Sequence, residues 1–108
     1  MQVACAIVTD EPLPPGAVVR VVVEDVSMAD GPARTVGERV LPARSVGPGP
    51  VLVSVAEVDP RAHYAVRVHV GAERGGTVSR GDLVSTAAHP VLTFGHPSSV
   101  RVPLQRVP

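Results

Sequence analysis

The chain has 108 residues, with ten acidic and ten basic side chains and a formal net charge of zero. A nucleic-acid-binding protein normally shows an excess of basic residues or a basic face, so this balance disfavours that class of protein. Tyr64 and Phe94 are the only aromatic residues, which disfavours a site that stacks sugars or single-stranded bases on aromatic rings.

Valine, proline and glycine dominate the sequence. The 24 valines indicate β-strands, because valine is stiff at χ1 and packs well on a pleated sheet. Twelve prolines and ten glycines are spread along the chain and leave no space for a long helix. The length fits one domain, residues 1–108, with a single core. No segment reaches the roughly 18 apolar residues of a membrane helix, so no direct membrane insertion is expected.

Short apolar segments separated by turn residues predict about seven strands. In chain order these strands are residues 3–8, 17–26, 34–41, 51–56, 63–70, 82–87 continuing as 91–94 after a break at Pro90, and 100–104. The longer turns between them are residues 11–16, 28–32, 42–50 and 71–81. Helical crossovers have no room here, so the sheets are expected to be antiparallel. The pattern predicts an all-β fold, a single antiparallel β-sandwich with the shape of an immunoglobulin or transthyretin domain.

The second and fifth predicted strands show which side chains should face the core. Alternation places Val19, Val21 and Val23 on one face of the second strand. Val18 and Val22 lie on its other face, where they form either an exposed apolar binding face or a surface covered by loops. In the fifth strand, alternation points Tyr64, Val66, Val68 and Val70 inward, and Arg67 and His69 outward.

Six residues are predicted to have structural roles. Tyr64 follows the turn at Asp59 and Pro60, and this arrangement is typical of a tyrosine corner, in which the hydroxyl bonds backbone a few residues upstream. Asp25 and Asp30 flank the turn after the second strand, where aspartate commonly accepts hydrogen bonds from turn amides. An acid–base pair formed by these carboxylates with Glu24 is the alternative. The sixth residue is Pro90, which interrupts a strand.

No catalytic, metal-binding or cofactor-binding residue is predicted, and the chain is not expected to be an enzyme. His63 and His69 lie about 20 Å apart if their strand is extended, too far to chelate one ion. His89 and His96 could pair only if the segment between them bends back. Cys5 lies in an apolar strand and is expected to be a buried, unreactive thiol with a raised pKa.

Three blocks of the sequence have a recognisable pattern. The first, residues 13–34, contains Leu13, Pro14, Pro15, Asp25, Val26, Ser27, Ala29 and Asp30. The second, residues 58–70, contains Asp-Pro and Tyr, and the third, residues 85–95, contains Pro-Val-Leu-Thr-Phe-Gly. In this order the blocks resemble the YbaY/YscW-type bacterial lipoprotein domain family. The resemblance implies a β-sandwich without enzymatic activity.

Some members of that family act as pilotins, outer-membrane lipoproteins that chaperone a secretin of a type III secretion system. The resemblance therefore implies a chaperone-like module that binds a protein partner. Two alternatives remain: a small-molecule binder with a pocket between the sheets or at one end, and a structural accessory domain that self-associates, for example as a homodimer.

The start of the chain bears on where the protein works. Cys5 follows four residues without the apolar segment of a signal peptide, so no lipid anchor is expected. The expected location is the cytoplasm for the chain as written, and the periplasm or cell envelope if a leader was removed.

Overall fold

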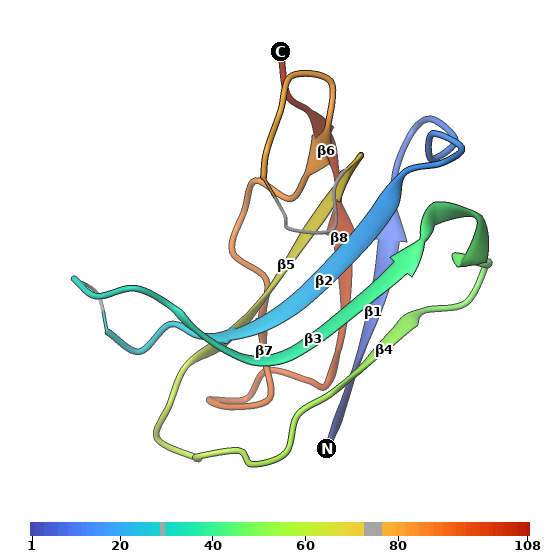
Figure 1. The fold of residues 1–108 in the computed structure, drawn as a ribbon. Helices are drawn as coiled ribbons and strands as arrows, with labels where there is room; N and C mark the ends of the chain where they lie inside the picture. Colours follow the sequence, from blue (N-terminus) through green and yellow to red (C-terminus); the bar gives the residue numbers. More distant parts are fainter. Residues whose placement is uncertain (29, 73–76) are drawn as a thin grey trace.

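A computed structural model describes residues 1–28, 30–72 and 77–108 (Figure 1). Ala29 of the first family block, and Gly75 and Gly76 of the predicted 71–81 turn, lie outside the described residues. The strands are β1 Gln2–Val8, β2 Val18–Asp25, β3 Arg34–Pro42, β4 Val51–Ser54, β5 Tyr64–Gly71, β6 Leu83–Val84, β7 Pro90–Val91, β8 Ser99–Pro103 and β9 Gln105–Arg106. A 3₁₀ turn, Ala43–Ser45, follows β3. Within the described parts of the chain, no helix is long and apolar enough to cross a membrane.

The strands form two sheets packed face to face, which confirms the predicted all-β sandwich. The small sheet has the order β4-β1-β8, and the large sheet has the order β3-β2-β5-β6-β9, with β7 also paired to β5. In Figure 1, β2 and β3 run side by side, and β1 lies in the layer behind them. Strand β2 is paired along its whole length with both β3 and β5, so it is an interior strand of the large sheet, next to the edge strand β3.

The core consists of the inward faces of the two sheets. The alternation predicted for β2 and β5 is present. Val19, Val21 and Val23 of β2, and Val66, Val68 and Val70 of β5, are at most 2% exposed. From the small sheet they meet Val3 and Cys5 of β1 together with Val51 and Val53 of β4. Burying a side chain of this size stabilises a fold by about 1.5–3 kcal/mol, so the valine faces hold the two sheets together.

The prediction of purely antiparallel sheets is wrong for one pair of strands. β1 and β8 run parallel, with Ala4 opposite Ser99 and Val8 opposite Pro103. The chain passes through the large sheet between these two strands, and it therefore returns in the parallel direction without a helical crossover. The remaining strand pairs are antiparallel.

The predicted strand at 82–94 is also corrected. Only two short segments of it pair, β6 at Leu83–Val84 and β7 at Pro90–Val91. Leu92 and Phe94 have φ values of 74° and 54°. These left-handed conformations are incompatible with a continuous strand, so the chain bends into a loop after β7.

The two sheets meet at two corners. At one corner the chain passes from β8 of the small sheet to β9 of the large sheet, and the Leu104 N–H donates to the Val8 carbonyl at 2.9 Å. At the other, Arg39 of β3 donates from Nη1 to the Leu52 carbonyl of β4 at 3.2 Å. A Cβ atom on Gly37 would lie 2.6 Å from the Ser54 backbone oxygen. β3 thus closely approaches the outer edge of β4, which would otherwise expose unpaired backbone groups.

Gly37→Ala is expected to destabilise the fold by about 1–3 kcal/mol, because the added methyl overlaps a backbone oxygen that cannot move without shifting β4. Gly47→Ala is the matched control, since nothing lies within 4 Å of its added Cβ, and it should change stability by less than about 0.5 kcal/mol. Urea unfolding followed by circular dichroism measures both variants. Equal stability of the two variants would contradict the tight corner.

Candidate functional site

The tyrosine corner lies at one end of the sandwich. Tyr64 is 3% exposed, and its hydroxyl accepts a hydrogen bond from the Asp59 backbone N–H at 2.8 Å. Oδ1 of Asp59 accepts a hydrogen bond from the Arg61 N–H at 2.9 Å. Pro60 is exposed in the same turn, and Pro90 begins β7 opposite Ala65. The turn before β5 is therefore tied to the first residue of that strand.

The carboxylates after β2 do not gather into an acid–base pair. Asp25 accepts a hydrogen bond from the Ser27 N–H at 3.0 Å. Hydrogen bonds from Ser27, supported by the charges of Arg34 and His63, hold the pKa of Asp25 below its ordinary value of 3.8. Asp30 is exposed in the following turn, whereas Glu24 turns to the outer face of the large sheet. Asp25 therefore stabilises a turn, as an aspartate commonly does.

All three sequence blocks meet beside this tyrosine corner. Ser27 of the first block accepts a hydrogen bond from the His63 N–H of the second block at 2.8 Å. The His63 ring stacks on Phe94 of the third block, with centroids 4.1 Å apart and the planes 8° from parallel. The Thr93 hydroxyl donates to the Ala62 carbonyl at 2.6 Å in a buried position. These contacts hold the loop after β7 against the turn before β5.

This end of the sandwich also exposes large apolar side chains. Met28 is 72% exposed, Phe94 57% and Val26 40%, and the Val26 N–H donates to the His63 carbonyl at 2.8 Å. We call Val26, Met28, His63 and Phe94 the aromatic end. The left-handed backbone of Phe94 costs about 1–3 kcal/mol, and strain of this kind concentrates at functional sites. The aromatic end is thus an exposed and largely apolar surface beside the contacts that join the three blocks.

Sequence reasoning did not single out Phe94. Its signal was available: one of two aromatic residues in the chain lies in a stretch rich in turn residues, between Thr93 and Gly95. The sequence predicts a strand at residues 91–94 and gives no sign that Phe94 is exposed. Its exposure goes with a left-handed backbone conformation, which only the structure shows.

The outer face of the large sheet is not an exposed apolar face. Val22 is 1% exposed, and Val18 is half-buried. Two ion pairs flank Val22 from neighbouring positions: Arg20 meets Glu38 at 2.7 Å, and Arg67 meets Glu24 at 3.0 Å. The aliphatic stems of such side chains readily cover apolar surface. Of the two alternatives for Val18 and Val22, the exposed apolar binding face is therefore wrong, because charged side chains cover this surface.

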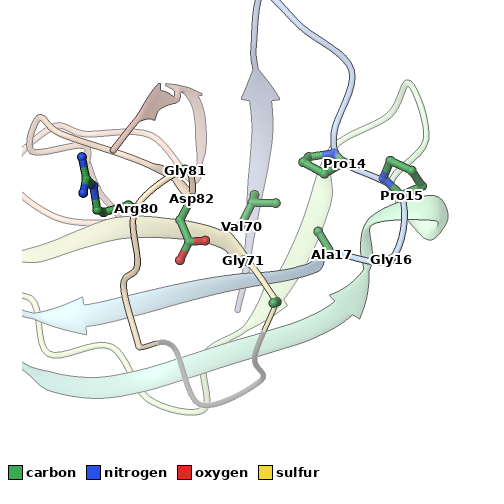
Figure 2. Close-up of a pocket in the computed structure, with 10 residues that line it drawn as sticks. Pro14, Pro15, Gly16, Ala17, Val70, Gly71, Arg80, Gly81 and Asp82 are labelled. Carbon is green, nitrogen blue, oxygen red and sulfur yellow. The ribbon is translucent and has the colours of Figure 1, made fainter. Parts of the chain in front are cut away.

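A cleft of about 320 Å³ lies at the opposite end of β5 (Figure 2). Its lining includes Pro14 and Pro15 of the first family block, Gly71 at the end of β5, and Asp82. Figure 2 shows the Asp82 carboxylate pointing toward Gly71 and the two prolines on the other side of the cleft. Most of this lining is backbone and small apolar side chains, with few groups that could orient a ligand.

The Asp82 carboxylate already has hydrogen-bonding partners within the protein. His69 Nε2 lies 2.8 Å from Asp82 Oδ2, with the two side chains 9% and 13% exposed. The same oxygen accepts a hydrogen bond from the Ser79 N–H at 2.9 Å. His69, and then Ser79, hold the pKa of Asp82 below its ordinary value of 3.8. Although His69 lies on the outer face of β5 as predicted, it is buried because Asp82 covers it.

The histidines and Cys5 are the remaining candidate residues. Within residues 1–28, 30–72 and 77–108, no three side chains from His, Cys, Asp and Glu are grouped to hold a metal ion. Cys5 is fully buried, and this burial raises the pKa of its thiol to about 11. The thiol therefore stays protonated at neutral pH and is a poor nucleophile.

Comparisons with known proteins show the family of the chain and agree with its fold. The sequence model of a family described as type III secretion system lipoprotein chaperone (YscW) matches residues 2–104. The fold is similar to that of an alternative pilotin from the type II secretion system of Vibrio cholerae, with a TM-score of 0.75 and 18% sequence identity over 98% of this chain and 97% of that chain. No curated protein matches the sequence.

Tyr64→Phe is expected to lower the free energy of unfolding by about 1–2 kcal/mol, because the partly buried Asp59 N–H loses its acceptor. Phe94→Tyr is a control that adds a ring hydroxyl at an exposed position, and its free energy of unfolding should stay within about 0.5 kcal/mol of that of the parent. Chemical denaturation measures both variants. A Tyr64→Phe variant as stable as the parent would contradict the structural role predicted for this hydroxyl.

Asp82→Asn is expected to be less stable than the parent at pH 7. The pKa of Asp82 is lower in the folded protein than its ordinary value of 3.8, so the ionised carboxylate stabilises the fold at pH values above 3.8. This contribution is lost as the pH falls through the lowered pKa of the folded state. The stability gap between parent and variant should therefore close below about pH 4. Thermal melts between pH 2 and pH 8 measure this gap. A gap that is constant across this range would contradict the His69–Asp82 linkage.

Proposed function

From the premise that the chain belongs to the type III secretion system lipoprotein chaperone (YscW) family, we propose that it is a chaperone-like binding module for a protein partner. The residues 1–108 act together as one domain in this proposal. The family description and the pilotin of similar fold both point to secretion systems. A secretin, the kind of protein that pilotins chaperone, is therefore the first candidate for the partner.

The observation that supports binding is the aromatic end. Aromatic side chains and methionine are enriched in protein interfaces, and exposed aromatic side chains are the usual anchors of binding energy. Phe94 and Met28 are 57% and 72% exposed, and the stack of Phe94 on His63 fixes its ring in advance. A pre-positioned anchor loses little side-chain entropy on binding, which favours affinity.

A small-molecule binder is the second candidate, and the cleft beside Gly71 is the observation that favours it. The cleft is large enough for a small ligand at about 320 Å³. Its carboxylate, Asp82, is already engaged by His69 and Ser79, and Arg80 is the other charged residue of the lining, so the cleft offers few polar groups to orient a ligand. Binding of a protein at the aromatic end is therefore the better-supported function.

Phe94→Asn tests the proposal without threatening the fold, because asparagine tolerates the left-handed conformation better than phenylalanine. The tagged protein is used to capture partners from a lysate of the source organism, and mass spectrometry quantifies the secretin and other captured proteins. We expect the parent to enrich a partner and Phe94→Asn to lose about tenfold or more of it, as for loss of an aromatic anchor.

Val78→Asn is the matched control, since Val78 is similarly exposed at 55% but lies outside the aromatic end. This variant should capture as much partner as the parent. If Phe94→Asn retains full capture, or both variants lose it equally, the aromatic end is not the docking surface. If the parent captures no partner, the chaperone proposal itself fails, and thermal-shift screening of small molecules would examine the cleft.

A further inference from the structure

Another cavity, of about 270 Å³, lies on the outer face of the large sheet. Its lining includes Arg20 of β2, Arg67 and His69 of β5, Val84 of β6, and Val78 of the segment before β6. It shares no lining residue with the cleft beside the end of β5. A water molecule takes up about 30 Å³ in the liquid, so the cavity has room for a ligand of about nine non-hydrogen atoms.

Strand pairing brings the polar residues of this cavity together. Arg20 lies directly opposite His69 in the β2–β5 pair, and Arg67 lies two residues before His69 on the same face of β5. Residues directly opposite each other have Cβ atoms about 5 Å apart, and residues two apart in a strand lie about 7 Å apart. On its other side His69 lies opposite Val84 of β6. The lining therefore combines two arginines and a histidine with the apolar Val78 and Val84.

The charged side chains of the lining are cationic. Among the described residues that line the cavity, none is acidic. The carboxylates that pair with the two arginines, Glu38 with Arg20 and Glu24 with Arg67, lie outside the lining. Arg67 meets Glu24 through Nη2 at 3.0 Å, so the N–H groups on its Nε and Nη1 can bind a further acceptor. A guanidinium with such donors matches the geometry of a carboxylate.

His69 adds a buried atom that lacks a partner. Its side chain is 9% exposed, and Nε2 lies 2.8 Å from Oδ2 of Asp82. The pKa of Asp82 is below its ordinary value of 3.8, so at neutral pH Asp82 is ionised and only accepts, and Nε2 carries the donated proton. Nδ1 is buried and makes no hydrogen bond with any described residue. An unpaired buried polar atom destabilises a fold, and a ligand oxygen at Nδ1 would remove this cost.

We propose that this cavity binds a small carboxylic acid with a short apolar tail. The carboxylate of the ligand accepts hydrogen bonds from Arg67 and from the protonated Nδ1 of His69, and the tail packs on Val78 and Val84. The cavity shares no residue with the aromatic end, and the inference does not rest on the proposed function. The two sites can therefore be tested separately.

Binding of the acid is coupled to protonation of His69. The imidazolium lies between two carboxylates, that of the ligand and that of Asp82. Arg20 and Arg67 are the cationic groups beside it, and β6 contributes the apolar Val84. The ligand offsets the charge of the arginines, so it favours the imidazolium form more than the unbound protein does. Nδ1 therefore takes up a proton from solvent when the acid binds.

The test uses 4-methylpentanoate, whose size suits the cavity, and its neutral twin 4-methylpentanamide. Each is titrated into the ¹⁵N-labelled protein at neutral pH. We expect the acid to shift the backbone amide signals of residues 67–69 and 84–85, and to move the Nδ1 signal of His69 to the position of a protonated nitrogen. The amide should bind at least about tenfold more weakly, because hydrogen bonds to a charged group are the stronger ones.

Three variants locate the site, and their backbone spectra show that each is folded. Arg67→Gln should weaken binding of the acid by about tenfold or more, because a charged donor is lost. Val78→Ala shortens the apolar contact and should weaken binding by about threefold to fivefold. Arg101→Gln is the matched control, since it removes an exposed arginine of the small sheet and the same charge, and it should bind the acid as the parent does.

The proposal is overturned if the acid does not bind, if the acid and the amide bind equally, or if Arg67→Gln and Arg101→Gln have the same effect. It is also overturned if the acid binds without changing the Nδ1 signal of His69. A short peptide that ends in leucine presents a similar carboxylate and apolar group. We expect it to bind more weakly than the acid, because the volume leaves no room for the rest of the peptide; tighter binding would replace the small acid by a peptide C-terminus.

Discussion

The contact between two valine-lined sheet faces is the constraint on which the rest of the structure depends. The interior strand β2 of the large sheet supplies Val19, Val21 and Val23, and the central strand β1 of the small sheet supplies Val3 and Cys5. Branched side chains with few rotamers lose little freedom on packing and fill space uniformly. A core of this kind holds two sheets in register without a disulfide and with only one buried aromatic side chain, Tyr64.

One face of each sheet forms the core, and the two outer faces differ in the side chains that they carry. The large sheet covers its outer face with ion pairs from its own side chains, which place Val22 out of contact with solvent. The outward residues of the small sheet are uncharged apart from Arg101. The two outer faces therefore differ: ion pairs flank Val22 on the large sheet, whereas Arg101 on the small sheet takes part in none of the ion pairs found in the described part of the chain.

The ends of the sandwich depend on contacts between segments distant in the sequence. At one end, Tyr64, Ser27 and Thr93 tie a turn, a strand end and a loop together, and the loop presents Phe94. At the other, the His69–Asp82 pair fastens residues 79–82 to β5. The contacts of Tyr64, Thr93 and the His69–Asp82 pair are buried or partly buried, and such a contact is worth more than the same contact in water. Binding loops of β-sandwiches are commonly held on a rigid scaffold in this way.

The sequence by itself determined the features that have a local period. Alternation of valines identified β2 and β5 and their inward faces, and the spacing of Asp59, Pro60 and Tyr64 indicated a turn with a hydroxyl close to upstream backbone. These inferences need only the two-residue repeat of a strand and the chemistry of neighbouring residues. Only the tertiary structure decided the parallel pairing of β1 with β8, the partner of His69, the screening of Val22 and the left-handed backbone that exposes Phe94. Each of these depends on which distant segments meet, and no local pattern in a single sequence encodes that choice.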